Sequence, residues 1–255
     1  MDKKNYIKRT NDNFLMNVNP EEHIQQHIFW YGNYESELNQ FLKRVIKPGD
    51  IFFDCGANIG YFSLLAARYG ATVFAFEPVN TTFQKLIANL ALNNSQRIFP
   101  IKMAVGNISG EKEIYLSGEE NIGMSSFMHP ENYAGLSESV QVTRLDDWIA
   151  GSDIHNIDII KLDIEGSELS ALQGMKVTLE KNKPLVISEI NPETLLQFEI
   201  NPSDIINFMF DLNFECYVIF DGGKLRIKGS GRINQTINVL FIHPEKKASY
   251  PDLFN

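Results

Sequence analysis

Five acidic residues each follow an apolar stretch of the sequence and could together form a ligand site. They are Asp54, Glu77, Asp163, Glu165 and Glu189. If the apolar stretches are parallel strands, their carboxyl ends share one edge of a sheet, where α/β proteins bind ligands. Carboxylates at that edge can accept hydrogen bonds from sugar hydroxyls, bind a positive group, or take up a proton during a reaction.

The loop DCGANIG, residues 54–60, stands between an apolar strand and an amphipathic helix, where nucleotides are usually bound. A pyrophosphate site there commonly has the pattern G-x-G-x-x-G, whose glycines let the backbone approach the phosphates. Only Gly56 and Gly60 are present, with Asn58 in place of the second glycine. The carboxylate of Asp54 would repel a phosphate by roughly 4 kcal/mol at about 4 Å and an effective dielectric of about 20. The loop therefore indicates a ligand that carries a positive group and no phosphate.

The pair Glu77-Pro78 ends the next apolar strand, about where an acid accepts hydrogen bonds from both ribose hydroxyls in a nucleoside site. S-adenosylmethionine has an amino group and a sulfonium for the acids, a ribose for Glu77, and no phosphate. We therefore predict S-adenosylmethionine as the cofactor. The missing second glycine and Asp54 argue against a nicotinamide cofactor, and hence against an oxidoreductase on the same type of sheet.

The elements that would position these residues follow from the hydrophobic periodicity. A helix is expected within residues 35–46, and KPGD ends it. Strands are expected at residues 51–54, 72–76, 98–103, 157–162 and 184–190, and helices at 61–69, 81–93 and 167–175. Near-continuous apolar strands joined by helices predict a doubly wound, mostly parallel α/β sheet that is covered on both faces.

The alternation of strands and helices is interrupted between Ala104 and Asn156. EKEIYL and SVQVTRL predict an antiparallel β insertion, and the long polar segment between them is of a length that is usually functional or disordered. Near the end of the chain, a hairpin around Asp221-Gly222-Gly223 predicts one antiparallel strand. We expect residues 1–47 to form a helical cap segment packed on a single globular domain, residues 48–255.

The composition is that of an ordinary globular protein, with 44% apolar and 22% charged residues in a chain of 255. A net charge of −9 argues against a nucleic-acid partner. No apolar run approaches the roughly 18 residues of a transmembrane helix, and the first residues lack a secretory signal pattern. The two cysteines, Cys55 and Cys216, lie in apolar strand-like segments, as buried thiols in a reducing compartment would. We therefore expect a cytoplasmic enzyme.

Several motifs, in order, resemble the FkbM family of class I S-adenosylmethionine-dependent methyltransferases. They are WYGNYESE, FDCGANIGYFSLLAA with FAFEP, KMAVGNISG, VTRLDDW and, above all, IIKLDIEGSELSALQGM, and the likeness covers residues 30–190. The resemblance implies a Rossmann-like, seven-stranded sheet whose last strand is antiparallel. It also implies O-methylation of a hydroxyl on a sugar, glycan, glycolipid or polyketide-type acceptor.

The resemblance further implies how the cofactor is held. The loop of residues 54–60 would bind the methionine moiety, Glu77 the ribose, and Ala104–Val105 the adenine, while the pair Tyr34-Glu35 would close over the cofactor. The predicted cofactor-binding residues are Tyr34, Glu35, Asp54, Cys55, Gly56, Ala57, Asn58, Gly60, Glu77, Pro78, Ala104, Val105 and Asp163. Cys55 stands where valine or isoleucine is expected, which is a conservative change.

The predicted catalytic residues are Asp163, Glu165 and Glu189. A hydroxyl acceptor needs a base as its bond to the methyl group forms, and we expect Glu165 or Asp163 in this role, with Glu189 as the substitute. A divalent cation bound to the three acids is an alternative to which we do not commit. Asp163 and Glu165 could instead cap the helix that follows them.

Two other functions remain open on this fold: N-methylation of an amine, and a non-catalytic module that only binds S-adenosylmethionine. His129 and His243 are further candidate bases, but His243 follows the last strand beside a proline and His129 lies in the long polar segment. The predicted partner is a small-molecule, glycan or polyketide acceptor.

Overall fold

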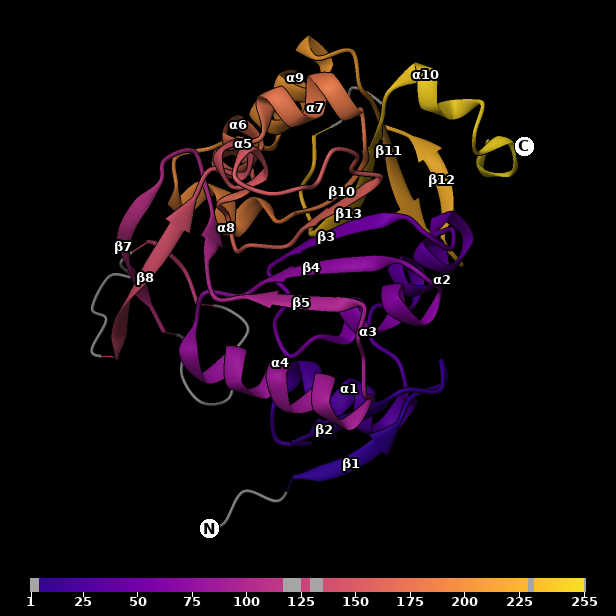
Figure 1. Ribbon diagram of the computed structural model, residues 1–255. Helices are drawn as coiled ribbons and strands as arrows, with labels where there is room; N and C mark the ends of the chain where they lie inside the picture. The colour runs from indigo at the N-terminus through magenta and orange to yellow at the C-terminus, as the bar shows by residue number, and fades with distance from the viewer. Residues whose placement is uncertain (1–4, 117–124, 129–134, 229–231, 255) are drawn as a thin grey trace.

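The computed structural model describes residues 5–116, 125–128, 135–228 and 232–254, and its centre is an eight-stranded sheet (Figure 1). The strands in chain order are β3 (Ile51–Cys55), β4 (Thr72–Phe76), β5 (Ile98–Ile101), β9 (Ile159–Leu162), β10 (Leu185–Ile190), β11 (Glu215–Phe220), β12 (Lys224–Ile227) and β13 (Ile237–Ile242). In space their order is β12-β11-β13-β10-β9-β3-β4-β5. The strands from β10 to β5 are parallel, whereas β13 is antiparallel to both its neighbours and β12 is antiparallel to β11.

The doubly wound, mostly parallel sheet is confirmed, but its number of strands differs from the expectation. The resemblance implied seven strands, and β12 adds an eighth strand and a second antiparallel one. The reason is the turn Asp221-Gly222-Gly223, whose residues all have positive φ and reverse the chain directly after β11. The predicted hairpin therefore becomes the edge of the sheet.

Helices cover both faces of the sheet and enclose two apolar cores (Figure 1). One face carries α2 (Ser36–Val45), α3 (Tyr61–Arg68) and α4 (Asn80–Leu92), and the other carries α5 (Leu145–Ala150), α6 (Glu168–Gly174), α7 (Lys176–Asn182) and α9 (Pro202–Asp211). Successive strand residues such as Phe52 and Phe53 enter different cores, because side chains alternate between the faces of a strand. None of the helices that the structure describes has both the length and the apolar composition of a membrane span.

The N-terminal segment consists of a hairpin and two helices on the first face. β1 (Tyr6–Arg9) and β2 (Leu15–Val18) pair antiparallel and are followed by α1 (His23–Tyr31) and α2. β2 lies against α4, where Asn93 Oδ1 accepts from Leu15 N at 2.8 Å and Asn89 Oδ1 from Asn17 N at 2.7 Å. The segment predicted as helical thus also contains strands, and a division of the chain at residue 47 stays a prediction.

The β insertion predicted after the third strand is a separate three-stranded sheet. Its strands are β6 (Ala104–Val105), β7 (Gly110–Tyr115) and β8 (Ser137–Thr143), in the order β6-β8-β7. β8 pairs parallel with β6 and antiparallel with β7. Of residues 117–136 between β7 and β8, the structure describes 125–128 and 135–136, and His129 lies outside the described residues.

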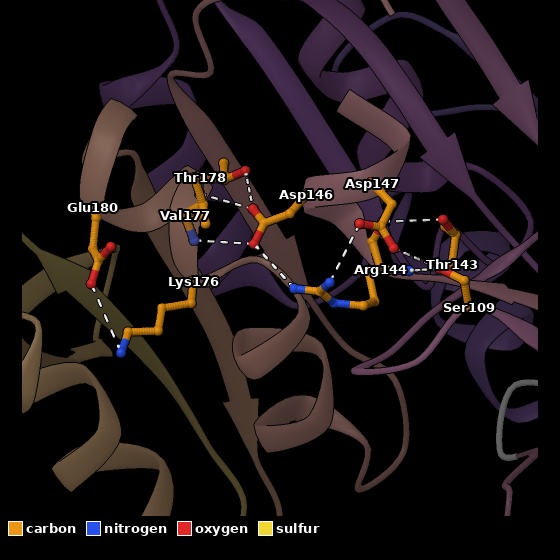
Figure 2. Close-up of polar contacts among 9 residues, drawn as sticks. All are labelled: Ser109, Thr143, Arg144, Asp146, Asp147, Lys176, Val177, Thr178 and Glu180. Carbon is orange, nitrogen blue, oxygen red and sulfur yellow. Dashed lines mark hydrogen bonds and ion pairs between the residues drawn. The ribbon is translucent and has the colours of Figure 1, made fainter. Parts of the chain in front are cut away.

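The motif VTRLDDW ties α5 to α7, as Figure 2 shows. α7 begins without a capping side chain of its own, and Asp146 of α5 takes this role. Its carboxylate accepts from the backbone N–H groups of Val177 at 3.0 Å and Thr178 at 2.9 Å, and from the Thr178 hydroxyl at 2.7 Å. The guanidinium of Arg144 lies 3.8 Å from Asp146 and 3.4 Å from Asp147. The motif therefore fixes α5 at the start of α7.

Candidate active site

A cavity lies where β3, β4, β9 and β10 end, as expected for the carboxyl edge of a parallel sheet. Its empty volume is about 830 Å³, part of which is open to solvent. The cavity brings together the predicted site residues Tyr34, Gly56, Asn58, Glu77, Pro78, Ala104, Val105, Asp163, Glu165 and Glu189. Residues from six separate segments of the sequence thus meet at one place.

The other predicted residues, Glu35, Asp54, Cys55, Ala57 and Gly60, are not among those that line the cavity. Cys55 is fully buried in the second core, and burial raises the pKa of its thiol. Gly60 is the residue before α3, where its positive φ turns the loop into the helix. Direct contacts of these five residues with a cofactor stay predictions.

Gly56 lets the loop after β3 pass close to the end of β9. Its φ is +82°, and a Cβ atom on it would lie 1.9 Å from the carbonyl oxygen of Asp163. The N–H groups of Gly56 and Ala57 both donate to Phe76 O, at 3.0 and 2.9 Å, which joins the loop to β4. A side chain at position 56 would therefore push apart two walls of the cavity.

Glu77 is held in place by two backbone donors on the cavity wall. Its Oε2 accepts from Asn58 N at 3.0 Å and its Oε1 from Val79 N at 2.9 Å. Burial raises the pKa of this carboxyl to about 7, although both hydrogen bonds act to lower it. Each carboxylate oxygen has a second lone pair, so Glu77 can still accept hydrogen bonds from two hydroxyls of a ligand.

Asp54 lies behind the cavity wall rather than on it. Its side chain is fully buried, and Oδ2 accepts from Ser63 Oγ at 2.6 Å. Oδ1 has no hydrogen-bond partner among the described residues and lies 4.0 Å from Lys161 Nζ. Burial raises the pKa of the Asp54 carboxyl, and Lys161 acts in the opposite direction.

Lys161 is the charged residue of this network that the sequence interpretation did not include. It lies in the middle of the buried strand β9, its side chain is 3% exposed, and its Nζ is 3.0 Å from Asp163 Oδ2. Nζ also lies 5.0 Å from the ring centre of Phe62. A lysine inside an apolar strand, two residues before Asp163 and thus on the same side of the strand, is the signal that could have identified it.

The cavity and its immediate surroundings contain more carboxylates than ammonium groups. Burial, together with the negative charge of Asp163, raises the pKa of Glu35 to about 7, of Glu165 to about 8 and of Glu189 to about 9. Asn238 donates to Glu35 at 3.1 Å and pairs with Glu189 across β10 and β13. Such a site favours a ligand with a positive charge, because a cation stabilises the ionised carboxylates.

The turn between β9 and α6 is held by a different acid, Glu168, the first residue of α6. Glu168 Oε1 accepts from the backbone N–H groups of Ile164 at 3.0 Å and Gly166 at 3.3 Å. Glu165 has a φ of +52° in this turn and lines the cavity. α6 begins without a side-chain cap at Ser167, and Asp163 and Glu165 line the cavity, which supports the functional interpretation of these two acids.

His243, the second candidate base, lies at the start of α10 (Pro244–Lys247), where its Nδ1 accepts from Glu245 N at 3.3 Å, and it is not among the residues that line the cavity. Within the described part of the chain, no group of three or more His, Cys, Asp or Glu side chains is arranged to hold a metal ion. The alternative with a divalent cation therefore gains no support from these residues.

The sheet and its acid-lined edge define a Rossmann-like α/β protein of the class I methyltransferase type. Residues 54–216 match the family model described as the methyltransferase FkbM domain, and the chain belongs to this family. It is a methyltransferase, and membership of the family supports S-adenosylmethionine as the methyl donor.

Curated relatives are similar over part of their length. The 2-O-methyltransferase NoeI of Sinorhizobium fredii is 25% identical over 72% of this chain and 80% of its own. The hexuronic acid methyltransferase AglP of Haloferax volcanii is 26% identical over 69% and 67%, respectively. The 31-O-demethyl-FK506 methyltransferase FkbM of Streptomyces tacrolimicus is 31% identical over 51% and 61%. Among solved structures, the methyltransferase FkbM from Methylobacillus flagellatus is 19% identical, with a TM-score of 0.47 over 80% of this chain and 50% of that one.

Proposed function

We propose that the chain transfers the methyl group of S-adenosylmethionine to a hydroxyl of a sugar, glycan, glycolipid or polyketide-type acceptor. The observation that carries the proposal is that one cavity joins Glu77 to the acids Asp163, Glu165 and Glu189. A hydroxyl as the acceptor is supported by the relatives named as a 2-O-methyltransferase and a 31-O-demethyl-FK506 methyltransferase, and a sugar-type acceptor by the hexuronic acid methyltransferase.

The residues of the cavity fit the proposed methyl donor. The hydroxyl of Thr82 is buried on the wall without a hydrogen-bond partner among the described residues, so a polar ligand atom would satisfy it. Phe76 and Ala104–Val105 offer apolar surface to an adenine ring. The described lining residues include no lysine or arginine, which suits a ligand without phosphate groups.

Bound S-adenosylmethionine would supply a methyl group activated by the positive charge of its sulfonium. The residues of the chain hold the acceptor in line with this group, exclude water and take the proton of the hydroxyl. Asp163 is already paired with the ammonium of Lys161, so we assign proton removal to Glu165 or Glu189. The pKa values of about 8 and about 9 at these two carboxyls make them stronger bases than an ordinary glutamate.

Calorimetric titration with S-adenosylhomocysteine and with NADH tests the cofactor. We expect the wild type to bind only S-adenosylhomocysteine, and Glu77→Ala to lose this binding. Glu180→Ala is the matched control, because Glu180 is an exposed acid paired with Lys176 on α7. Binding of NADH, or of neither compound by the wild type, would overturn the proposal.

An acceptor screen tests the reaction itself. S-adenosylmethionine is supplied with neutral sugars, amino sugars, hexuronic acids and polyketides, and mass spectrometry locates the new methyl group on oxygen or nitrogen. The excess of carboxylates around the cavity also suits an amine acceptor, so methylation of nitrogen alone would favour N-methylation. Binding of S-adenosylhomocysteine without turnover of any acceptor would favour the non-catalytic module.

A further inference from the structure

Lys161 connects two carboxylates that come from different strands. Its Nζ lies 3.0 Å from Oδ2 of Asp163, which lines the cavity, and 4.0 Å from Oδ1 of Asp54, which is buried behind the wall. The Oδ1 atom of Asp54 has no hydrogen-bond partner among the described residues, so Lys161 is the cation that compensates its charge. The ring of Phe62, 5.0 Å away, further confines the ammonium.

The titratable groups that interact electrostatically with Lys161 are predominantly acidic. They are Asp54 and Cys55 of β3, Glu35 before α2, Asp163 and Glu165 after β9, and Glu189 of β10. Burial alone would lower the pKa of Lys161, but Asp163, Asp54 and Glu35 outweigh it and raise the pKa above its ordinary value. Lys161 therefore stays protonated and cannot remove a proton from an acceptor.

We propose that Lys161 is a positioning residue, whose buried ammonium joins the Asp54 loop to Asp163 and directs the Asp163 carboxylate into the cavity. This role rests on the proposed function, because Asp163 is placed there beside the transferred methyl group. Lys161 acts through the two carboxylates and does not line the cavity itself. Without it, the buried Asp54 would lack a counter-charge and take up a proton more readily, and Asp163 would lose its ion-pair partner.

The first test measures urea unfolding of the unliganded protein at pH 5 and pH 8. In Lys161→Met, the carboxylates lose their counter-charge, so ionising them costs stability as the pH rises above their unfolded-state values. The urea midpoint of the variant should therefore fall further below that of the wild type at pH 8 than at pH 5. A loss of packing alone would give the same difference at both pH values and would overturn the proposal.

Lys43→Met is the matched control for the measurement of affinity for S-adenosylhomocysteine. Lys43 also pairs with a buried acid, Asp12, but neither residue lines the cavity. Its variant should bind S-adenosylhomocysteine as the wild type does. Lys161→Arg keeps the charge and should restore most of the pH behaviour of the wild type, and failure to do so would contradict the electrostatic role.

The second test measures the affinity for S-adenosylhomocysteine at pH 7 and pH 9. Burial already raises the pKa of Asp54, and loss of an opposite charge within about 4 Å raises a carboxyl pKa by roughly 1–3 units more, so Lys161→Met should bind S-adenosylhomocysteine about tenfold or more weakly at pH 7. The ratio of its dissociation constant to that of the wild type should shrink at pH 9, where Asp54 ionises without Lys161. A ratio that does not change with pH would overturn the proposal.

Two variants and one binding measurement keep the role of Lys161 and the proposed function distinguishable. If Lys161→Met does not fold, Asp163→Asn replaces it, because this variant removes the acid through which Lys161 acts. Asp163→Asn should bind S-adenosylhomocysteine more weakly than the wild type, and an unchanged dissociation constant would overturn the role of Lys161. If the wild type binds no S-adenosylhomocysteine at any pH, the proposed function fails, while the unfolding comparison still tests the link between Lys161 and the two acids.

Discussion

Gly56→Ala is expected to damage both stability and catalysis, because it forces apart two walls of the cavity. The new Cβ would lie 1.9 Å from Asp163 O, and real Cβ atoms essentially never approach closer than 3.0 Å, so the two segments must separate by about 1.1 Å. The backbone conformation adds a cost of about 1–2 kcal/mol, since φ is positive. With the roughly 1–3 kcal/mol typical of overpacking, the free energy of unfolding should fall by about 2–5 kcal/mol.

Gly49→Ala separates these two contributions. Gly49 has a similar φ of +96°, but a Cβ atom on it would meet nothing within 4 Å. This control should therefore lose only about 1–2 kcal/mol in urea unfolding and keep its activity. In Gly56→Ala, a displacement of about 1 Å beside Asp163 should lower kcat/KM by roughly 10²-fold. Equal stability and equal kcat/KM for the two variants would refute this account of the loop.

Three further predictions concern single acidic side chains. Asp146→Ala should lower the free energy of unfolding by about 1–2 kcal/mol, because the start of α7 loses its cap, and calorimetry should find the affinity for S-adenosylhomocysteine unchanged. Glu77, with a pKa of about 7, binds hydroxyls best as a carboxylate. The affinity of the wild type should thus rise by up to about tenfold per pH unit below that pKa, and a rise that persists in Glu77→Gln would contradict this. In the wild type, kcat should increase between pH 7 and pH 9, because Glu165 and Glu189 lose their protons in this range. The increase should disappear in Glu165→Gln or in Glu189→Gln, and its persistence in both variants would refute the assignment of the base.

Much of the fold follows from hydrophobic periodicity, because a parallel sheet buried on both faces needs near-continuous apolar strands. Strands β3, β4, β9 and β10 therefore begin and end close to their predicted limits. The edge strand β12 was harder to predict. The turn Asp221-Gly222-Gly223 indicates a hairpin, but pairing of its second strand at the sheet edge depends on the tertiary arrangement of β11.

In the candidate site, too, some residues could be predicted from the sequence and others could not. Acids that directly follow strands, such as Glu77 and Asp163, were identified from the sequence because the edge of a parallel sheet is a general ligand site. The burial of Asp54 behind the wall could not be deduced, since it depends on where Ser63 of α3 and Lys161 of β9 place their polar groups. The orphaned hydroxyl of Thr82 is likewise visible only in three dimensions, because its sequence context is that of an ordinary first helical turn.

The acids around the cavity suggest how the charge of the donor affects binding before and after the reaction. Glu165 and Glu189 have pKa values of about 8 and about 9, so they lose protons as the pH rises from 7 to 9.5. S-adenosylmethionine carries a sulfonium charge that these carboxylates attract, whereas S-adenosylhomocysteine, the product of methyl transfer, has lost it.

The wild type should therefore prefer S-adenosylmethionine over S-adenosylhomocysteine increasingly strongly as the pH rises through this range. One carboxylate within about 4–6 Å of a cation corresponds to roughly 1–3 pKa units, so the ratio of the two dissociation constants should change about tenfold or more. Calorimetry on the wild type and on the double variant Glu165→Gln, Glu189→Gln measures this ratio, which should be nearly independent of pH in the variant. If the ratio of the two dissociation constants in the wild type does not change with pH, these acids do not interact electrostatically with the sulfonium. A changing ratio would mean that loss of the methyl group weakens the attraction that binds the cofactor, and so favours release of the product.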